Sequence, residues 1–118
     1  MVLVDTSVWV FHLRQGSEEL QKLLYEGEVV CHPFIVGELA CGNLKNRHEI
    51  LTYLQSLPMT ILAEDEEVLK FIENNQLMGK GLGYIDVHLI ASAVLTSVLV
   101  WTLDKSLKKF TQKFNINY

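Results

Sequence analysis

Two short apolar runs, each followed directly by an aspartate, constrain the fold of this chain most strongly. The run 2–4 precedes Asp5, and the run 98–103 precedes Asp104. A short continuous apolar run indicates a strand that is buried on both faces, as in a parallel sheet covered by helices. Because the carboxyl ends of parallel strands meet at one crevice, we expect Asp5 and Asp104 to converge there.

The rest of the chain alternates between strand patterns and helix patterns. Strands are predicted at 2–4, 29–31, 60–62 and 98–102, with a last edge strand at 116–118. Helices are predicted at 8–15, between 17 and 27, at 33–42 and 47–56, from 65 onward, and at 86–96 and 105–114. This alternation implies right-handed βαβ crossovers. The expected fold is therefore α/β, a three-layer α/β/α sandwich around a mostly parallel sheet, formed by one domain that spans 1–118.

Composition and charge narrow the class of protein. Of the 118 residues, 49% are hydrophobic and 20% are charged, which is typical of an ordered globular chain. The formal net charge is −4, so no overall basic field attracts nucleic acid. No window approaches the roughly 18 apolar residues that a membrane helix needs, and no targeting signal is evident. We expect a soluble cytoplasmic protein, in which Cys31 and Cys41 are buried free thiols.

Two further carboxylates lie in apolar surroundings on predicted helices. Glu38 lies within the apolar stretch 34–41, and Asp86 opens a helix. Helical spacing puts each on a face with apolar neighbours, so both are expected to point toward the sheet. Taken alone, Asp86 is explained by an N-cap and Asp5 by an Asx-turn. Together with Asp104, however, four carboxylates against a core require a compensating charge, which one divalent cation would provide.

The donor types indicate the metal and the chemistry. Carboxylate ligands without a histidine cluster favour Mg²⁺ or Mn²⁺ over zinc. A metal held in this way polarises a phosphodiester and generates hydroxide at neutral pH. Two ions would clamp the attacking and leaving oxygens, and a single ion also agrees with the pattern. The expected reaction is in-line hydrolysis of a nucleic-acid backbone.

Four stretches of the chain resemble a known family when they are taken in order. They are Val4-Asp5-Thr6-Ser7, Glu38-Leu39-Ala40-Cys41-Gly42, Gly83-Tyr84-Ile85-Asp86 with Ile90-Ala91-Ser92-Ala93, and Thr102-Leu103-Asp104. This set resembles the PIN domain and, more narrowly, the ribonuclease toxin of bacterial VapBC-type toxin–antitoxin pairs. No single stretch is specific, but the ordered set covers essentially the whole chain.

The resemblance implies a PIN-like fold and a metal-dependent endoribonuclease of structured RNA that is held inactive by a cognate antitoxin protein. It matches six residues to the family's functional positions: Asp5, Glu38, Asp86 and Asp104 as the acidic metal-binding set, with Ser7 and Thr102 as neighbouring polar residues that orient those carboxylates or a water. Members of the family often form homodimers and bind Mg²⁺ or Mn²⁺. RNA, an antitoxin and a second copy of the chain are therefore the expected partners.

Two departures from the family pattern matter. Many relatives have Arg where this chain has Leu103, which weakens any claim about phosphate contacts at that position. Some relatives carry a further acidic residue just after the last aspartate, where this chain has Lys105-Ser106-Leu107. The second departure favours a less tightly bound second metal ion.

The histidines are weaker candidates for a catalytic role. His88 lies two residues after Asp86, about 200° around a helix, so it is predicted to face away from the carboxylates. His32 precedes Pro33 and is better explained by hydrogen bonding within its loop than by metal ligation.

The basic and aromatic residues leave alternatives open. The glycine-rich loop 79–83 is not a Walker A motif, and Lys80 within it is either a solvated side chain or a phosphate contact. Lysines 105, 108, 109 and 113 form either a solvated helix face or a phosphate-binding face. Trp9 favours the core, but with Phe11 and Leu13 it also fits a groove for a partner helix or a dimer contact.

Two other functions compete with the nuclease. A phosphoacceptor receiver domain has a similar length and alternation, but it needs an acidic pair after the first strand, where Thr6 follows Asp5. A non-catalytic PIN-like binding module would use the acidic pocket to receive an arginine from a partner. The intact set of four carboxylates argues against this second alternative.

Overall fold

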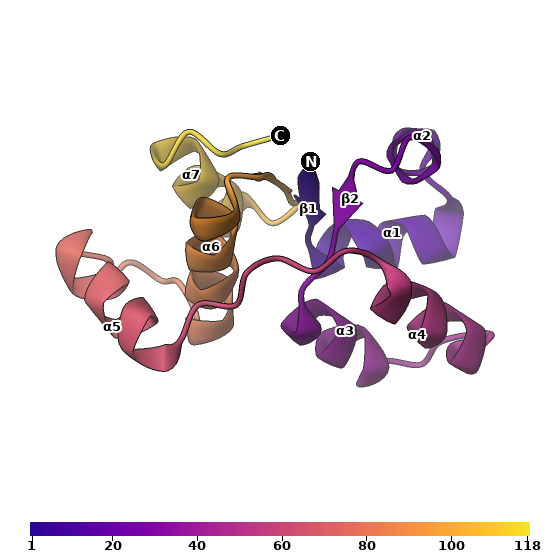
Figure 1. The fold of residues 1–118 in the computed structure, drawn as a ribbon, viewed down its shortest axis with the longest axis horizontal. Coiled ribbons are helices and arrows are strands. Elements are labelled where there is room, and N and C mark those ends of the chain that lie inside the picture. Colours follow the sequence, from indigo (N-terminus) through magenta and orange to yellow (C-terminus); the bar gives the residue numbers. More distant parts are fainter.

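The computed structural model describes residues 1–118 and contains three strands and seven helices (Figure 1). In chain order these are β1 (Val2–Val4), α1 (Thr6–Gln15), α2 (Glu18–Tyr25), β2 (Val29–Val30), α3 (Pro33–Ala40), α4 (Arg47–Ser56), α5 (Asp65–Asn74), α6 (Tyr84–Thr96), β3 (Leu99–Trp101) and α7 (Lys105–Lys113). The strand order is β2-β1-β3, and both pairings are parallel. The first strand of the chain is therefore the central strand of the sheet.

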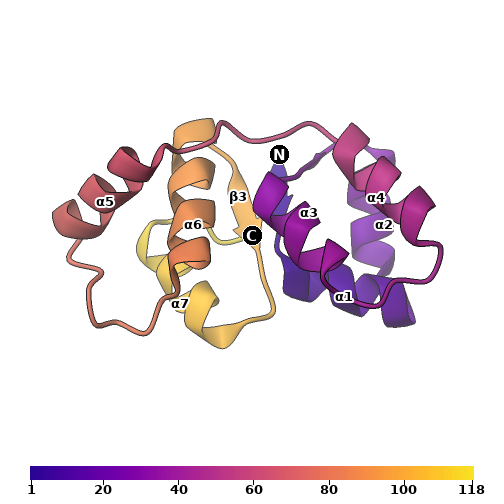
Figure 2. The ribbon, with the colours of Figure 1, turned by 90° about the horizontal axis from the view of Figure 1, so that it is seen from below.

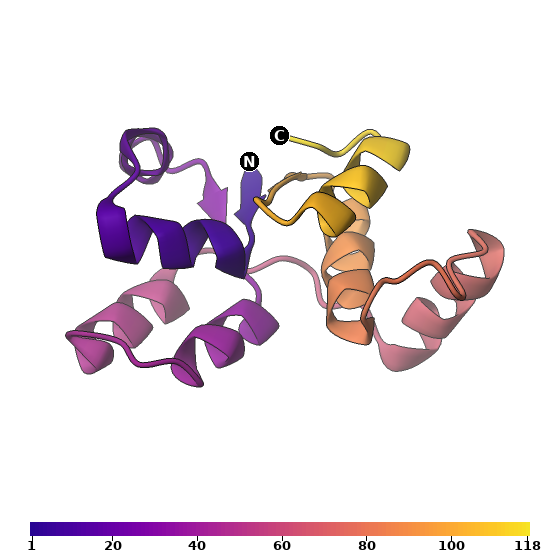
Figure 3. The ribbon, with the colours of Figure 1, turned by 180° about the vertical axis from the view of Figure 1, so that it is seen from behind.

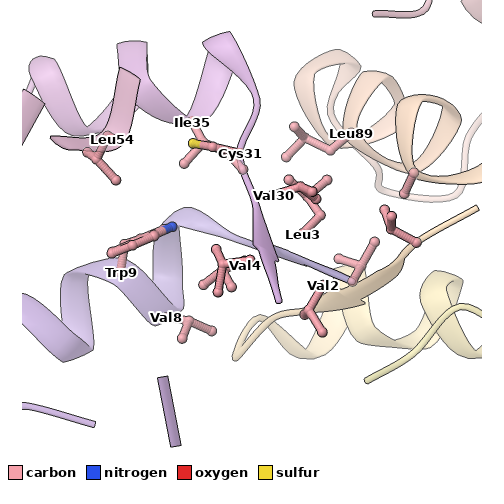
Figure 4. Packing of buried hydrophobic residues seen from close by; sticks show 14 of the residues in the cluster. Val2, Leu3, Val4, Val8, Trp9, Val30, Cys31, Ile35, Leu54 and Leu89 are labelled. Atoms are coloured by element: carbon pink, nitrogen blue, oxygen red, sulfur yellow. The ribbon is translucent and has the colours of Figure 1, made fainter. Parts of the chain in front are cut away.

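Helices flank the short sheet on two sides. Figures 1, 2 and 3 show α1 to α4 on one side of the strands and α5 to α7 on the other. One cluster of buried side chains joins the strands to the first group of helices (Figure 4), and a second cluster joins α5, α6 and α7. The predicted α/β architecture with a parallel sheet between helical layers is confirmed.

Helix α6 connects the two clusters. All seven residues from Val87 to Ala93 are buried. Leu89 and Ala93 belong to the cluster around the sheet, whereas Ile90 belongs to the cluster with α5 and α7. A helix that is apolar on every side is stable only when it is enclosed. This enclosure fixes the position of the N-terminal turn of α6, which carries Asp86.

Two of the predicted strands are wrong. Thr60 donates its N–H to the carbonyl of Cys31, and Met59 forms one parallel bridge there. The chain then leaves the sheet, because the N–H of Ile61 donates to Thr96 Oγ1 at the end of α6 (2.9 Å). The predicted strand at 116–118 is likewise reduced to a single bridge between Asn117 and Val100.

Two helices begin two residues earlier than predicted. The N-cap of α1 is Asp5, so the helix begins at Thr6. The N-cap of α6 is Gly83, so the helix begins at Tyr84. Asp86 is therefore the third residue of α6 and not its cap.

Two further expectations concern the cysteines, which were expected to be buried free thiols, and the absence of a membrane-spanning helix. Cys31 is buried and free, and its burial raises the pKa of its thiol to about 11. Cys41 is also free, but it is exposed because it caps the C-terminus of α3 at the surface, so the prediction of burial is wrong there. None of the helices combines the length and apolar character needed to cross a bilayer.

The central place of β1 predicts a large effect of truncating Leu3, whose side chain is fully buried. Leu3→Ala is expected to lower the free energy of unfolding by about 2–5 kcal/mol, because it leaves a cavity between the flanking strands and helices. The matched control is Leu69→Ala on α5, where the leucine is 57% exposed and the change should cost less than about 0.5 kcal/mol. Urea unfolding followed by circular dichroism measures both, and equal losses would contradict the packing described above.

Candidate functional site

Asp5 stands at the carboxyl end of the central strand. Strand β1 pairs with β3 so that Val4 lies opposite Trp101, and the N–H of Asp5 donates to the carbonyl of Trp101 (2.9 Å). The next residue of each segment, Asp5 and Thr102, therefore meet at the same edge of the sheet. Asp5 is only 7% exposed. Its burial agrees with the prediction from the apolar run before it.

Two hydroxyl groups hold the Asp5 carboxylate. Ser7 Oγ and Thr102 Oγ1 each donate to Asp5 Oδ2 at 2.8 Å. A hydroxyl has only one proton to donate, so the 3.4 Å separation between the two hydroxyl oxygens is a contact between groups whose protons are already used. In turn, the N–H of Leu103 donates to Ser7 Oγ and the N–H of Asp104 donates to Thr102 Oγ1, both at 3.0 Å. The network fixes one oxygen of Asp5 and leaves Oδ1 without a partner in the chain.

Asp104 is fixed in a comparable way by the helix that follows it. As the N-cap of α7, it accepts hydrogen bonds on Oδ1 from the N–H groups of Ser106 (2.8 Å) and Leu107 (3.3 Å). These bonds satisfy two of the unpaired donors at the start of the helix. The other oxygen, Oδ2, has no partner in the chain.

Glu38 is oriented by a residue that the sequence prediction missed. Thr6 Oγ1 donates to Glu38 Oε1 at 2.8 Å, which joins α3 to the start of α1. Neither the Thr6 nor the Ser7 hydroxyl caps α1, because each donates to a carboxylate instead. The signal available in the sequence was that both residues directly follow Asp5. Again one carboxylate oxygen, Oε2, is left without a partner.

The expectation that all four carboxylates pack against the core is wrong for two of them. Glu38 and Asp104 are exposed, and Asp86 is partly buried. The reason at α3 is that Ile35 and Leu39 form its buried face, so that Glu38 remains at the surface beside them.

Asp86 lies within the electric field of the other three carboxylates. Burial, together with the negative charges of Asp5, Asp104 and Glu38, raises the pKa of Asp86 from 3.8 to about 6. The ion pair of Met1 with Glu28 and the contact of His88 with Asp65 involve none of the four. The four negative charges are therefore close enough to oppose one another and have no cationic partner in the chain.

The arrangement of the four carboxylates decides which kind of metal ion fits between them. No three acidic, histidine or cysteine side chains are already close enough to ligate one ion together. Mg²⁺, however, usually keeps several waters and binds protein through one or two carboxylates. The free oxygens of Asp5, Glu38 and Asp104, whose charges act on an uncompensated Asp86, fit a hydrated hard cation of this kind.

The side chains of His88 and His32 make their hydrogen bonds with partners other than the four carboxylates. His88 is buried, with Nε2 3.2 Å from Asp65 Oδ1. His32 caps α3: its Nδ1 accepts the N–H of Phe34 (3.0 Å), and its Nε2 lies 3.2 Å from Ser92 Oγ. Burial and the nearby His88 ring lower the pKa of His32 to about 4. Both imidazoles thus have structural partners.

The basic residues around the site are mostly free. Lys113 alone among the C-terminal lysines has a partner, the carbonyl of Asn75 at 3.4 Å. Lys80 is exposed in the glycine-rich loop, where Gly79 and Gly81 adopt positive φ angles of 68° and 83° that favour glycine. The loop therefore makes a tight turn before α6.

A groove opens beside Glu38. Its volume is about 530 Å³, and it lies between α1, α3 and the start of α4. Val10, Leu13, Leu39 and Ile50 form apolar parts of its wall, and Arg14 and Lys45 are charged parts. Trp9 does not line this groove but is buried in the core, as predicted, whereas Phe11 is exposed.

Comparisons with known proteins agree with this arrangement. The model of the PIN domain family matches residues 2–113. The chain is 41% identical over 109 residues to Ribonuclease VapC32 of Mycobacterium tuberculosis, in both strain CDC 1551 / Oshkosh and strain H37Rv, covering 92% of this chain and 88% of each relative. The fold is also similar to the crystal structure of PAE2754 from Pyrobaculum aerophilum, with a TM-score of 0.61, 17% identity, and coverage of 92% of this chain and 77% of that one.

A small parallel sheet with acidic residues at the carboxyl ends of two neighbouring strands, together with the family match, defines the class: the chain belongs to the PIN-domain family. The similarity to Ribonuclease VapC32 extends over nearly the whole length and identifies it as a VapC-type member of that family. The resemblance drawn from the four ordered stretches is confirmed, and the receiver-domain alternative is wrong.

The raised pKa of Asp86 predicts a pH-dependent cost to stability. The folded protein retains the Asp86 proton up to about pH 6 whereas the unfolded chain loses it near 3.8, so the free energy of unfolding falls as pH rises between these values. In metal-free protein, Asp86→Asn is expected to raise stability at pH 7.5 by about 1 kcal/mol, after allowance for partial solvent exposure. This gain should shrink toward pH 4.

Urea unfolding in EDTA at pH 4 and pH 7.5 measures this effect. The matched control is Glu73→Gln on the exposed side of α5, which should leave stability nearly unchanged at both pH values. A stabilisation by Asp86→Asn of the same size at both pH values would contradict an electrostatic origin.

Proposed function

We propose that this protein is a metal-dependent endoribonuclease that hydrolyses RNA phosphodiester bonds and acts as the toxin of a toxin–antitoxin pair. The observation that carries the proposal is the arrangement of free oxygens. Asp5, Glu38 and Asp104 each keep one oxygen in a hydrogen bond within the chain and leave the other free, while their charges act on Asp86. The similarity to Ribonuclease VapC32 supports the choice of RNA as substrate.

Asp5, Glu38, Asp86 and Asp104 would hold one or two ions of Mg²⁺ or Mn²⁺. Such an ion polarises the phosphodiester and makes water a stronger acid at neutral pH. A cation is also required for binding, because four carboxylates in a protein of net charge −4 repel a polyanion.

The residues around the acidic site orient it. Ser7 and Thr102 hold the Asp5 carboxylate in one rotamer, and Thr6 does the same for Glu38. Preorganised groups of this kind do not have to rearrange during the reaction. The exposed lysines of α7 follow Asp104 directly and are suited to contact phosphates on either side of the cleaved bond.

Replacement of Asp5 tests the activity. Asp5→Asn keeps an acceptor for Ser7 and Thr102 but removes the charge, so we expect an unchanged circular dichroism spectrum and a loss of RNA cleavage by more than about 10³-fold. EDTA should abolish cleavage by the unmodified protein, and added Mg²⁺ or Mn²⁺ should restore it. Glu73→Gln is the control and should cut normally. Cleavage by Asp5→Asn at the normal rate would refute the proposal.

The same assay separates the nuclease from the alternative of a non-catalytic module. A module that only receives a partner's arginine in the acidic pocket would bind that partner but would cut no RNA at any metal concentration. Magnesium titration with purified protein and total RNA distinguishes the two functions.

The partners follow from the same proposal. The groove beside Glu38 is suited to an antitoxin segment with apolar residues along one side. Exposed Ile61 and Leu95 near the end of α6 are suited to contact a second copy of this single-domain chain. The expected location is the cytoplasm, where RNA is found.

Light scattering should give the mass of a homodimer, and the product of an adjacent reading frame should add to that mass and suppress cleavage. A monomer that no such product inhibits would contradict both assignments.

A further inference from the structure

A second cavity lies close to the acidic residues but shares none of them. Its volume is about 370 Å³, within the usual range for small-molecule sites. Phe34 and His88 form part of its wall, together with Leu62 and Asp65. Phe34 precedes Glu38 by four residues on α3, which is about 6 Å along the helix axis. The wall of the cavity therefore lies about one helical turn from Glu38.

The rings of Phe34, His32 and His88 line this cavity, and the ring of Tyr84 packs against His88. The ring of Phe34 lies 5.0 Å from that of His88 and 4.9 Å from that of His32, and Tyr84 lies 4.7 Å from His88. Although the two histidines are buried, Phe34 remains 36% exposed and Tyr84 46% exposed. Exposed aromatic rings supported from behind are the surfaces on which unpaired nucleobases stack.

The rings are held rigidly by hydrogen bonds. His32 Nδ1 accepts the N–H of Phe34, so the neutral imidazole carries its proton on Nε2 and donates it to Ser92 Oγ. Asp65 Oδ1 is bonded by Tyr84 Oη (3.0 Å) and by His88 Nε2 (3.2 Å). Asp65 Oδ2 has no partner in the chain, and the Asp65 side chain is 83% exposed. Together with Glu64, which also lines the cavity, Asp65 provides anionic acceptors next to the aromatic rings.

We propose that this cavity binds one unpaired nucleobase of the RNA next to the cleaved bond and selects guanine. The base stacks on Phe34, and Asp65 Oδ2 accepts hydrogen bonds from its Watson–Crick edge. Guanine is the base whose edge has two adjacent donors, N1–H and the 2-amino group. The other three bases present a carbonyl or ring-nitrogen acceptor beside their donor, which a carboxylate repels. The assignment rests on the proposed ribonuclease activity and adds the base that the enzyme reads.

Three variants test the assignment on short single-stranded RNAs that carry guanine, inosine or adenine beside the cleavage site. Phe34→Leu keeps apolar volume but removes the ring, so KM should rise about 5- to 150-fold with kcat nearly unchanged, as expected for the loss of 1–3 kcal/mol of uniform stacking energy. Asp65→Asn keeps an oxygen for Tyr84 and His88 but turns the free acceptor into a donor. It should abolish the preference for guanine over inosine, which lacks the 2-amino group.

Tyr25→Leu is the matched control, because Tyr25 on α2 is 94% exposed and lies outside the cavity, and its KM should equal that of the unmodified protein. Cleavage without regard to the neighbouring base, or an unchanged KM for Phe34→Leu, overturns the inference while the nuclease proposal stands. If the unmodified protein cuts no RNA, the nuclease proposal fails. Fluorescence anisotropy of guanine-containing RNA with Asp86→Asn protein then tests the cavity separately, and equal binding of guanine and adenine RNAs overturns it.

Discussion

The parallel pairing of β1 with β3 is the constraint on which the acidic site depends. Its register places Asp5 beside Thr102, 97 residues further along the chain, and the hydrogen bond between their side chains is 2.8 Å long. Ser7 then receives the N–H of Leu103 and closes the connection between the two strand ends. A shift of one residue in this register would turn Asp5 and Thr102 to opposite faces of the sheet, and the hydrogen bonds between them and Ser7 would be lost.

The enclosure of α6 adds an electrostatic cost to this arrangement. Because α6 packs against both core clusters, Asp86 cannot move away from the carboxylates at the strand ends without disturbing Leu89 and Ile90. Its pKa is raised to about 6 by burial and by those charges. A site that lowers the stability of the folded chain is typical of residues kept for function. A bound cation would remove the repulsion between these carboxylates. Metal binding would therefore both stabilise the fold and supply the proposed chemistry.

Helix α3 relates the acidic site to both cavities. Glu38 lies on the wall of the groove that we propose for the antitoxin, and Phe34, one turn earlier, lies on the wall of the cavity that we propose for guanine. Arg47 fixes the C-terminus of this helix by donating to the carbonyls of Ala40 and Gly42, and His32 caps its N-terminus. One short helix capped at both ends thus presents side chains to three neighbouring regions.

The sequence by itself determined the family, the parallel sheet and the convergence of Asp5 with Asp104, because an apolar strand followed by an aspartate is a local pattern. It also placed seven helices, although two of them begin two residues earlier than expected. The strand expected at 60–62 does not form, because the N–H of Ile61 bonds to Thr96, 35 residues further along the chain, and the strand expected at 116–118 is reduced to a single bridge. The exposure of Glu38, the role of Thr6 and the aromatic wall around His88 were decided only by tertiary structure. They depend on which helix faces meet, and a helical period alone does not specify the neighbour that packs against each face.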